Sequence, residues 1–331
     1  MDSTLARRTG YALGLAAALA VGPAAAAGRD GTLSLVWEND LFSQKDQHYT
    51  NGLLALWVPD DAPPPAWALR VARLLPGFPV TGEVRHGYAL GHAMFTANDI
   101  SLVEPPPGEP PYAGWLYGSV WLGVWNGRQA DQLTLTLGVV GPAALAEQGQ
   151  KFVHKITGSE DPRGWDTQLE NEPTLGLTYQ RSWRGEAVEL QGGKRFDFTP
   201  HAGGALGNVY TYANAGFTLR YGSQLPRDDA PLRVQPGPPG AGLYAAGDDF
   251  DWYLFAGVDG RAVARNLFLD GSTFEDSRGV DKKPLVADLQ IGVALTWRGA
   301  RLSYAQVLRT REYDHQPDPT DFGALTLSLP L

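Results

Sequence analysis

The chain of 331 residues contains no cysteine, and this absence excludes several classes of protein. Disulfide scaffolds, zinc–thiolate sites, iron–sulfur clusters and thiol catalysis all need cysteine. Positive charge is also scarce, because 27 Lys and Arg face 36 Asp and Glu, which gives a net charge of −9. A nucleic-acid binder that depends on a basic patch is therefore not expected. Beyond the N-terminus the chain lacks any run of about 18 apolar residues, which excludes a helical membrane protein.

Charged residues make up 19% of the chain, against about 25% in ordinary soluble domains. Glycine and aromatic residues are plentiful instead, with 40 Gly, 10 Trp, 13 Tyr and 12 Phe. A hydrophobic content of 43% excludes a disordered chain. This composition favours a β-rich protein that crosses an oxidising compartment.

The first 27 residues have the pattern of a secretory signal peptide. Arg7 and Arg8 form a positive n-region, residues 12–22 form an apolar stretch, and residues 24–27 offer a cleavage site of the A-x-A type. The apolar stretch is too short to span a bilayer. A buried alanine-rich helix is the alternative. We predict that this segment is removed and that residues 28–331 form the exported domain.

Strands with one apolar and one polar face run through the exported part. Between residues 285 and 297, apolar side chains recur at every second position, and polar or small residues separate most of them. This alternation is longer than the usual strand of about 5–6 residues and long enough to cross a bilayer when tilted. Shorter alternations occur at 133–139, 215–221 and 325–331. Such strands are typical of a transmembrane antiparallel up-and-down β-barrel.

Segments rich in proline interrupt this pattern at 60–65, 104–111 and 231–240. Proline cannot donate to a strand ladder, so these segments are predicted to be loops. No shift in composition marks a domain boundary. At about 22–28 residues per strand with its connection, the exported part accommodates about ten to fourteen strands. We predict one all-β barrel domain, with a soluble secreted β-sandwich or barrel as the alternative.

A polar cluster ends the first predicted strand and begins the second. The sequence Trp37-Glu38-Asn39-Asp40 is followed by Tyr49-Thr50-Asn51-Gly52, and the two strand ends meet at the outer rim of the barrel. The amide of Asn39, the carboxylate of Asp40 and the hydroxyl of Thr50 would share this edge. Three such oxygen donors suit a hard cation such as Ca²⁺. An ordinary polar hairpin with Asn, Asp and Gly turn residues is the alternative.

A second polar cluster begins at His154, continues through Glu160 and extends over 164–173. A neutral His is the natural base at pH 7 for taking a proton from water, and a nearby carboxylate would hold its tautomer or help to hold a metal. His48, beside the first cluster, competes for this role, whereas the other four His have no such polar neighbours. A His in a polar lumen or loop is the alternative. The chain has no Gly-x-Ser-x-Gly elbow, P-loop or dinucleotide fingerprint.

Five segments together resemble one known family. They are Glu38-Asn39-Asp40, Tyr49-Thr50-Asn51-Gly52, Met94-Phe95-Thr96, the aromatic stretch 111–117, and His154 with Glu160 and the run Gly-Trp-Asp-x-Gln-Leu-x-Asn-Glu-Pro at 164–173. Taken alone, the aromatic stretch fits an interfacial belt. In this order the segments are similar to the lipid A 3-O-deacylase family of Gram-negative outer membranes. The resemblance covers about half of the chain, and the remainder matches only as barrel strands.

The resemblance implies a barrel of about 12 strands that removes the 3-linked acyloxyacyl group of lipid A and depends on Ca²⁺. It also implies that the site consists of Asn39, Asp40, Thr50, His154 and Glu160. On this view Asp40 holds the cation with help from Asn39 and Thr50, and His154 activates water. Glu160 either orients His154 or completes the metal shell. We expect a monomer in the outer membrane, with a site that faces sideways into the outer leaflet.

One position departs from the family pattern. A lysine belongs to the family's site on the segment after Met94-Phe95-Thr96, but residues 97–102 contain no Lys. Arg70, Arg73 or Arg85 would replace it as an oxyanion donor, or the cation would act alone.

Two other functions compete with lipid A deacylation. The first is hydrolysis of another membrane lipid by a phospholipase with the same His and Ca²⁺ chemistry. The second is a passive barrel, such as a porin, with a polar lumen.

Overall fold

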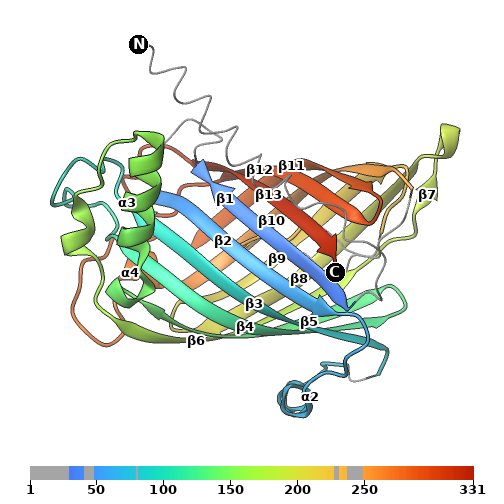
Figure 1. The fold of residues 1–331 in the computed structure, drawn as a ribbon. Coiled ribbons are helices and arrows are strands. Elements are labelled where there is room, and N and C mark those ends of the chain that lie inside the picture. Colours follow the sequence, from blue (N-terminus) through green and yellow to red (C-terminus); the bar gives the residue numbers. More distant parts are fainter. Residues whose placement is uncertain (1–29, 41–47, 80, 227–230, 237–248) are drawn as a thin grey trace.

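The computed structural model describes residues 30–40, 48–79, 81–226, 231–236 and 249–331 (Figure 1). Its strands are β1 (Gly31–Asn39), β2 (His48–Pro59), β3 (Glu83–Thr96), β4 (Ala113–Asn126), β5 (Gln129–Val140), β6 (Glu172–Trp183), β7 (Val188–Glu189), β8 (Arg195–Gly207), β9 (Tyr210–Gly222), β10 (Asp251–Asn266), β11 (Leu285–Trp297), β12 (Ala300–Arg309) and β13 (Thr320–Pro330). Its α-helices are α2 (Ala66–Leu74), α3 (Ala146–Thr157) and α4 (Leu267–Asp270), and its 3-10 helices are η2 (Pro142–Ala144), η3 (Gly164–Thr167) and η4 (Gln191–Gly193). Of the helices described, none is long and apolar enough to cross a membrane. The predicted signal peptide lies outside the described residues.

The strands form one antiparallel sheet that closes on itself (Figure 1). Over the described ranges the sheet has 13 strands in the order β6-β5-β4-β3-β2-β1-β13-β12-β11-β10-β9-β8-β7, and β6 also pairs with β8. The two-residue β7 pairs only with the start of β8, so twelve strands make the wall. A closed wall has no long unpaired edge. The predicted barrel of about 12 strands is confirmed, and the two-sheet sandwich is excluded.

The two ends of the barrel differ. The start of β1 and the end of β13 lie at one end, called the terminal end, together with the β2–β3 connection that contains α2 (Figure 1). The opposite end, called the loop end, carries the connections 97–112, 141–171 and 267–284, with α3 and α4. Long loops are typical of the outer side of such barrels and short turns of the periplasmic side. The loop end therefore corresponds to the predicted outer rim.

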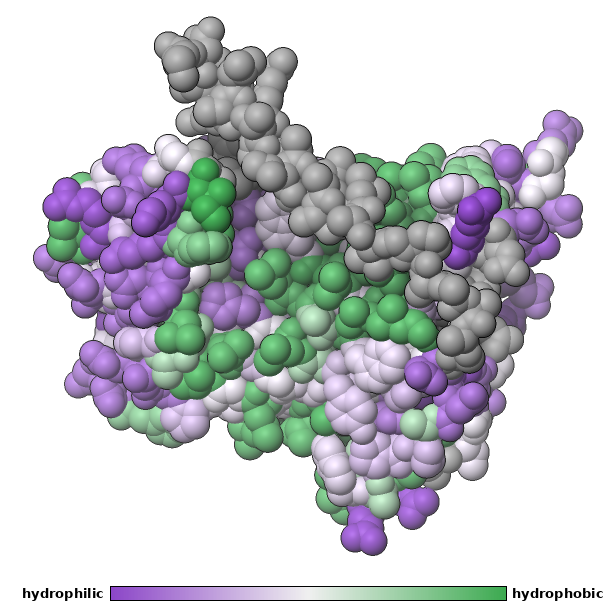
Figure 2. Space-filling model, in the orientation of Figure 1, coloured by the Kyte–Doolittle hydropathy of each residue, from purple (hydrophilic) through white to green (hydrophobic). Residues whose placement is uncertain are grey.

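The side chains of β11 alternate between the two faces of the wall. Leu285 points outward and is 71% exposed, whereas Asp288 and Gln290 point inward and are buried. The strand has the bounds that the alternation predicted. Trp183 and Trp297 end the outward rows of β6 and β11 at the terminal end and stay exposed, as in an aromatic girdle. Figure 2 shows the resulting apolar band across the wall between more hydrophilic ends.

An aromatic cluster fills the lumen near the loop end. Phe268 of α4 stacks on Phe95 of β3 with ring centroids 3.7 Å apart. Tyr49 packs edge-on against Phe322 at 5.2 Å. Aromatic pairs of this kind add about 0.5–1.5 kcal/mol each beyond the area that they bury. These side chains occupy the lumen at the end where a channel would open.

Residues 231–236, which belong to the β9–β10 connection, run inside the lumen. Glu38 accepts hydrogen bonds from the backbone nitrogens of Val234 at 2.9 Å and Gln235 at 3.1 Å. Arg309 donates to the side chain of Gln235 at 3.1 Å and to the carbonyl of Pro236 at 3.0 Å. The sequence predicted a loop at 231–240, and the described part of it lies inside the barrel because inward side chains satisfy its backbone groups. A lumen filled in this way counts against a porin.

Candidate active site

The polar residues at the end of β1 lie on the outward face of the wall. Glu38 points into the lumen, so its neighbour Asn39 points outward. Asn39 pairs with Asn51 of β2, and its amide nitrogen donates to Asn51 Oδ1 at 3.2 Å and to Thr50 O at 2.9 Å. Trp37 Nε1 also donates to Asn51 Oδ1, at 2.9 Å. These bonds fix Asn39 through its nitrogen, and an amide oxygen is the kind of atom that binds a hard cation.

A β-bulge presents Thr50 beside this group. The β2–β3 register shifts between Tyr49 and Asn51, which leaves Thr50 as the extra residue. The hydroxyl of Thr50 lies 2.7 Å from that of Thr96 on β3. Both side chains are buried. The structure thus brings Asn39 and Thr50 together, as the sequence predicted.

Asp40 follows β1 directly and is 1% exposed. Its carboxylate, the Asn39 amide oxygen and the Thr50 hydroxyl are oxygen donors of the types that Ca²⁺ binds in proteins. Within the described ranges, no group of three His, Cys, Asp or Glu is arranged to hold a metal. The donor types therefore fit a hard cation, with Asp40 as the acidic member.

Helix α3 lies against the outward face of β3 and β4 at the loop end (Figure 1). Gly114 of β4 permits this contact, because a Cβ there would lie 2.4 Å from the Cβ of Ala146. The helix begins after Leu145 and ends at Gly158, both in the left-handed region, with φ of 59° and 70°. Gly158 adopts this conformation without strain.

His154 occupies the last turn of α3 and is partly buried. The turn at Gly158 brings the chain back, so that His154 Nδ1 lies 2.5 Å from the backbone oxygen of Glu160. A carbonyl only accepts hydrogen bonds, so Nδ1 donates and the neutral ring carries its lone pair on Nε2. Glu160 thus contacts His154 through its backbone, and its side chain is exposed.

Gln150 is a further candidate site residue, which the sequence did not suggest. It lies one turn before His154 on the same face of α3 and is 3% exposed. Its Oε1 accepts a hydrogen bond of 2.7 Å from Trp165 Nε1, and its Nε2 is buried with no hydrogen-bond partner among the described residues. Two features of the sequence could have indicated Gln150. It lies four residues before His154, and Trp165 belongs to the run 164–173.

The three arginines predicted to replace the missing lysine lie at the wrong end of the barrel. Arg70 and Arg73 are on α2, which follows β2 at the terminal end. Arg85 lies near the start of β3, donates to Asp60 O at 2.8 Å, and is about 35 Å along the strand from Thr96 at about 3.3 Å per residue. This prediction is wrong, because the antiparallel strand order carries the β2–β3 connection away from α3.

His201 is placed differently from His154. His201 has a carboxylate partner, Asp259 at 2.9 Å, which the sequence did not reveal. This pair is buried in the lumen, away from the outward face. The side chain of the competing His48 lies outside the described residues.

The outer surface of α3 is apolar and basic. Phe152, Val153 and Ile156 are exposed on it. The carboxylate of Glu147, 2.5 Å from Lys151 Nζ, raises the pKa of Lys151, so this side chain stays positively charged at neutral pH. Such a surface can contact acyl chains and negatively charged headgroups together.

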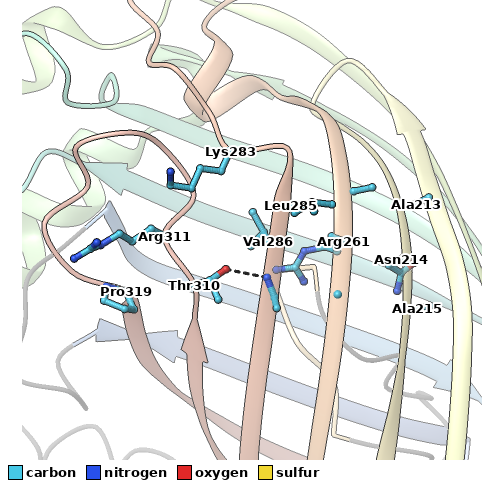
Figure 3. A pocket seen from close by; sticks show the side chains of 13 residues that line it. Ala213, Asn214, Ala215, Arg261, Lys283, Leu285, Val286, Thr310, Arg311 and Pro319 are labelled. Carbon is cyan, nitrogen blue, oxygen red and sulfur yellow. Dashed lines mark hydrogen bonds between the residues drawn. The ribbon is translucent and has the colours of Figure 1, made fainter.

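A cavity of about 1010 Å³ lies elsewhere, against β9 to β11 and the β12–β13 connection near the loop end (Figure 3). Two positively charged side chains that line it already have acidic partners. Arg261 donates a hydrogen bond to Asp288 at 2.7 Å, and Lys283 donates one to Asp314 at 2.6 Å. None of the described residues that line it is His, Asp or Glu. This cavity therefore offers no base for hydrolysis.

Comparison with known proteins identifies one family. The family model described as outer membrane protein LpxR matches residues 12–331. LpxR from Salmonella typhimurium is similar in structure, with a TM-score of 0.74 and 19% identity over 91% of this chain and 100% of that chain. The β domain of the Bordetella autotransporter BrkA matches with a TM-score of 0.46 and 10% identity over 92% of this chain and 100% of that chain. No curated protein sequence matches this chain.

Proposed function

The chain belongs to the outer membrane protein LpxR family, and from this premise we propose that it is an ester hydrolase that removes the 3-linked acyloxyacyl group of lipid A. The observation that carries the proposal is the side of the wall on which the site lies. Asn39 and the helix that bears His154 are on the outward face at the loop end. A lipid in the outer leaflet reaches them sideways, without entering the filled lumen.

His154 is the general base of the proposed reaction. Its Nε2 takes a proton from water, and the water oxygen attacks the ester carbonyl carbon. The bond from this carbon to the sugar oxygen then breaks, the sugar oxygen receives the proton from His154, and the free acyloxyacyl acid leaves. No acyl-enzyme forms. The hydrogen bond from Nδ1 to Glu160 O holds the ring in the required tautomer.

Gln150 is the proposed donor to the developing oxyanion. Its buried Nε2 lies on the face of α3 that carries His154, and the hydrogen bond from Trp165 fixes the orientation of the amide. A donor held in place before the reaction costs no reorganisation when negative charge develops. In this role Gln150 would take the place of the missing lysine as a donor to the oxyanion.

A Ca²⁺ ion is the proposed cofactor, held by Asp40 with the oxygens of Asn39 and Thr50. When bound, it would supply positive charge next to the ester oxygen. The support is the donor chemistry at the rim. Chelation with EGTA should abolish deacylation, and Ca²⁺ should restore it while Mg²⁺, which demands a smaller octahedral shell, should not. As a direct readout, calorimetry should detect Ca²⁺ binding to the wild type and not to Asp40→Ala.

The apolar surface of α3 supports a lipid as the substrate. Phe152 and Ile156 are exposed four residues apart on this helix, at the loop end of the apolar band. Acyl chains that leave the bilayer for the site would pass along this surface. The negatively charged headgroup would contact Lys151, which is exposed.

The test is mass spectrometry of lipid A from a Gram-negative host that expresses the wild type or His154→Ala. We expect loss of one 3-linked acyloxyacyl group with the wild type alone. Unchanged lipid A in both, with folded protein in the outer membrane, would overturn the proposal. Phospholipid vesicles with Ca²⁺ would then show whether fatty acid is released from phospholipids, and planar bilayers would show whether the barrel conducts ions.

A further inference from the structure

Helix α2 lies on the outward face of the wall at the terminal end, opposite to α3 (Figure 1). Leu122 and Val124 of β4 and Leu133 of β5 belong to outward rows, yet all three are buried. They form one apolar cluster with Ala72 of α2 and Phe78, which follows the helix. The helix therefore covers wall residues that would otherwise face lipid.

The segment after α2 is fixed to the wall by two contacts. Arg181 of β6 donates to the backbone oxygen of Gly77 at 2.7 Å. The ring of Phe78 packs edge-on against Tyr179 at 6.1 Å. Val124 is two positions from the end of β4, so the contact lies within about 10 Å of the strand end. With the loop end on the outer side, a position this close to the strand end is expected near the headgroups of the periplasmic leaflet.

The face of α2 that points away from the wall is apolar and positively charged. Trp67, Arg70 and Leu74 are spaced three and four apart and share this face. Trp67 is 45% exposed and Leu74 is 80% exposed. Arg70 and Arg73 are exposed, and neither has an ion-pair partner within the described ranges. The helix contains no acidic residue, and the nearest acids in the sequence, at 60–61, precede its proline-rich start.

We propose that α2 is an interfacial helix that binds the phosphate headgroups of anionic phospholipids in the periplasmic leaflet. Trp67 extends the girdle formed by Trp183 and Trp297 at the same end of the barrel. Arg70 and Arg73 add two positive charges in a chain whose net charge is −9. A helix that exposes Trp, Leu and Arg together on its outer surface carries the side chains that interfacial helices place among headgroups and the ends of acyl chains.

This role is independent of the proposed lipid A chemistry. The terminal end faces the leaflet opposite to the one that α3 faces, so the ligand is a phospholipid and not the substrate. The helix would hold the barrel at a fixed depth in the bilayer. It also accounts for Arg70 and Arg73, two of the three arginines offered above as alternatives to the missing lysine.

The absence of cysteine permits a direct test, because one introduced cysteine labels a single position. Ala66 is exposed and lies one turn before Arg70 on the same face of α2, so Ala66→Cys would provide the labelling site. The full-length barrel would be labelled there with a fluorophore and reconstituted into phosphatidylcholine vesicles. Small amounts of nitroxide-labelled phosphatidylglycerol or nitroxide-labelled phosphatidylcholine would then be added. The ratio of quenching by the two lipids reports the local preference for the anionic headgroup.

We expect phosphatidylglycerol to quench the label more strongly, with a preference of about fivefold for each arginine that acts. Arg70→Gln together with Arg73→Gln should bring the ratio close to one. Arg128→Gln should leave it unchanged, because Arg128 lies in a turn at the same end and donates to Glu186 at 2.8 Å. Equal quenching by both lipids in the wild type would overturn the proposal. So would quenching by aqueous iodide and by neither lipid, which would place α2 in water.

Discussion

Two amphipathic helices lie on the outward face of this barrel, one at each end, and they differ in what they turn toward the wall. Helix α2 buries Ala68 and Ala72 there. Helix α3 buries Ala146 and Gln150 and partly buries His154. Both helices expose apolar and basic side chains on the other side. The same kind of exposed surface therefore accompanies two different proposed roles.

The buried side is what distinguishes the helix that we propose to be catalytic. Burial of a polar group without a partner costs roughly 1–3 kcal/mol in proteins. Because of this cost, we expect a buried amide such as that of Gln150 only where it has a function that an alanine side chain could not perform. Amphipathicity alone indicates only that a helix lies at an interface, which is true of both α2 and α3.

His154→Ala should have the largest effect, because it removes the proposed base from the buried side of α3. General base catalysis contributes about 10²–10⁴-fold, and the rate of lipid A deacylation should fall by that factor. Lys155→Ala, at the exposed neighbouring position, is the matched control and should keep nearly full activity. Both rates would be measured on purified lipid A in micelles. Equal activity of the two variants would contradict the proposal that the buried face of α3 carries the catalytic base.

Gln150→Glu should have the next largest effect. The substitution keeps an oxygen that can accept the Trp165 hydrogen bond, and the ionised carboxylate has no N–H to donate. Because burial of a carboxylate is costly, a thermal melt would check that the fold is kept. Loss of one oxyanion donor costs about 10²–10³ in kcat. A fall in kcat with little change in KM would identify a donor that acts in the transition state. A rise in KM alone would instead assign Gln150 to substrate binding.

Gly114→Ala should displace α3 without breaking the barrel. The added Cβ meets the Ala146 Cβ at 2.4 Å, and overpacking of this kind costs about 1–3 kcal/mol. Gly118→Ala is the control on the same strand and face, where the nearest heavy atom would be 3.8 Å away. Hydrogen exchange of residues 146–157 should rise only in Gly114→Ala, and deacylation should fall with it. Unchanged exchange in that variant would show that α3 is not held by this contact.

Residues on regular strands could be predicted from the sequence. The alternation from Leu285 to Trp297 fixes both the strand and its orientation, since one face meets lipid and the other a polar lumen. The proximity of Asn39 and Thr50 could be predicted in a similar way, because consecutive antiparallel strands meet at one rim of the barrel. Local pattern and chain direction suffice for such residues.

The remaining features depend on contacts between distant segments. Gln150 matters because Trp165 packs beside it, and no period in the sequence links the two residues. Arg70 and Arg73 were assigned to the wrong end because charge alone does not reveal which rim a connection occupies. The proline-rich segment at 231–236 has the composition of a surface loop, yet Glu38 and Arg309 hold it inside the lumen.

Phe78→Ala should have the smallest effect on catalysis and is the sharpest test of the separation between the two helices. Truncation of a buried Phe costs about 3–5 kcal/mol, which is enough to release α2, because a helix this short is marginal without tertiary contacts. Hydrogen exchange of residues 66–79 should rise strongly, whereas residues 146–157 and the deacylation rate should stay within about twofold of the wild type. Phe274→Ala, an exposed position at the loop end, should change neither. A parallel loss of deacylation in Phe78→Ala would mean that the two ends of the barrel are coupled through the wall. It would contradict the proposal that α2 and α3 act independently.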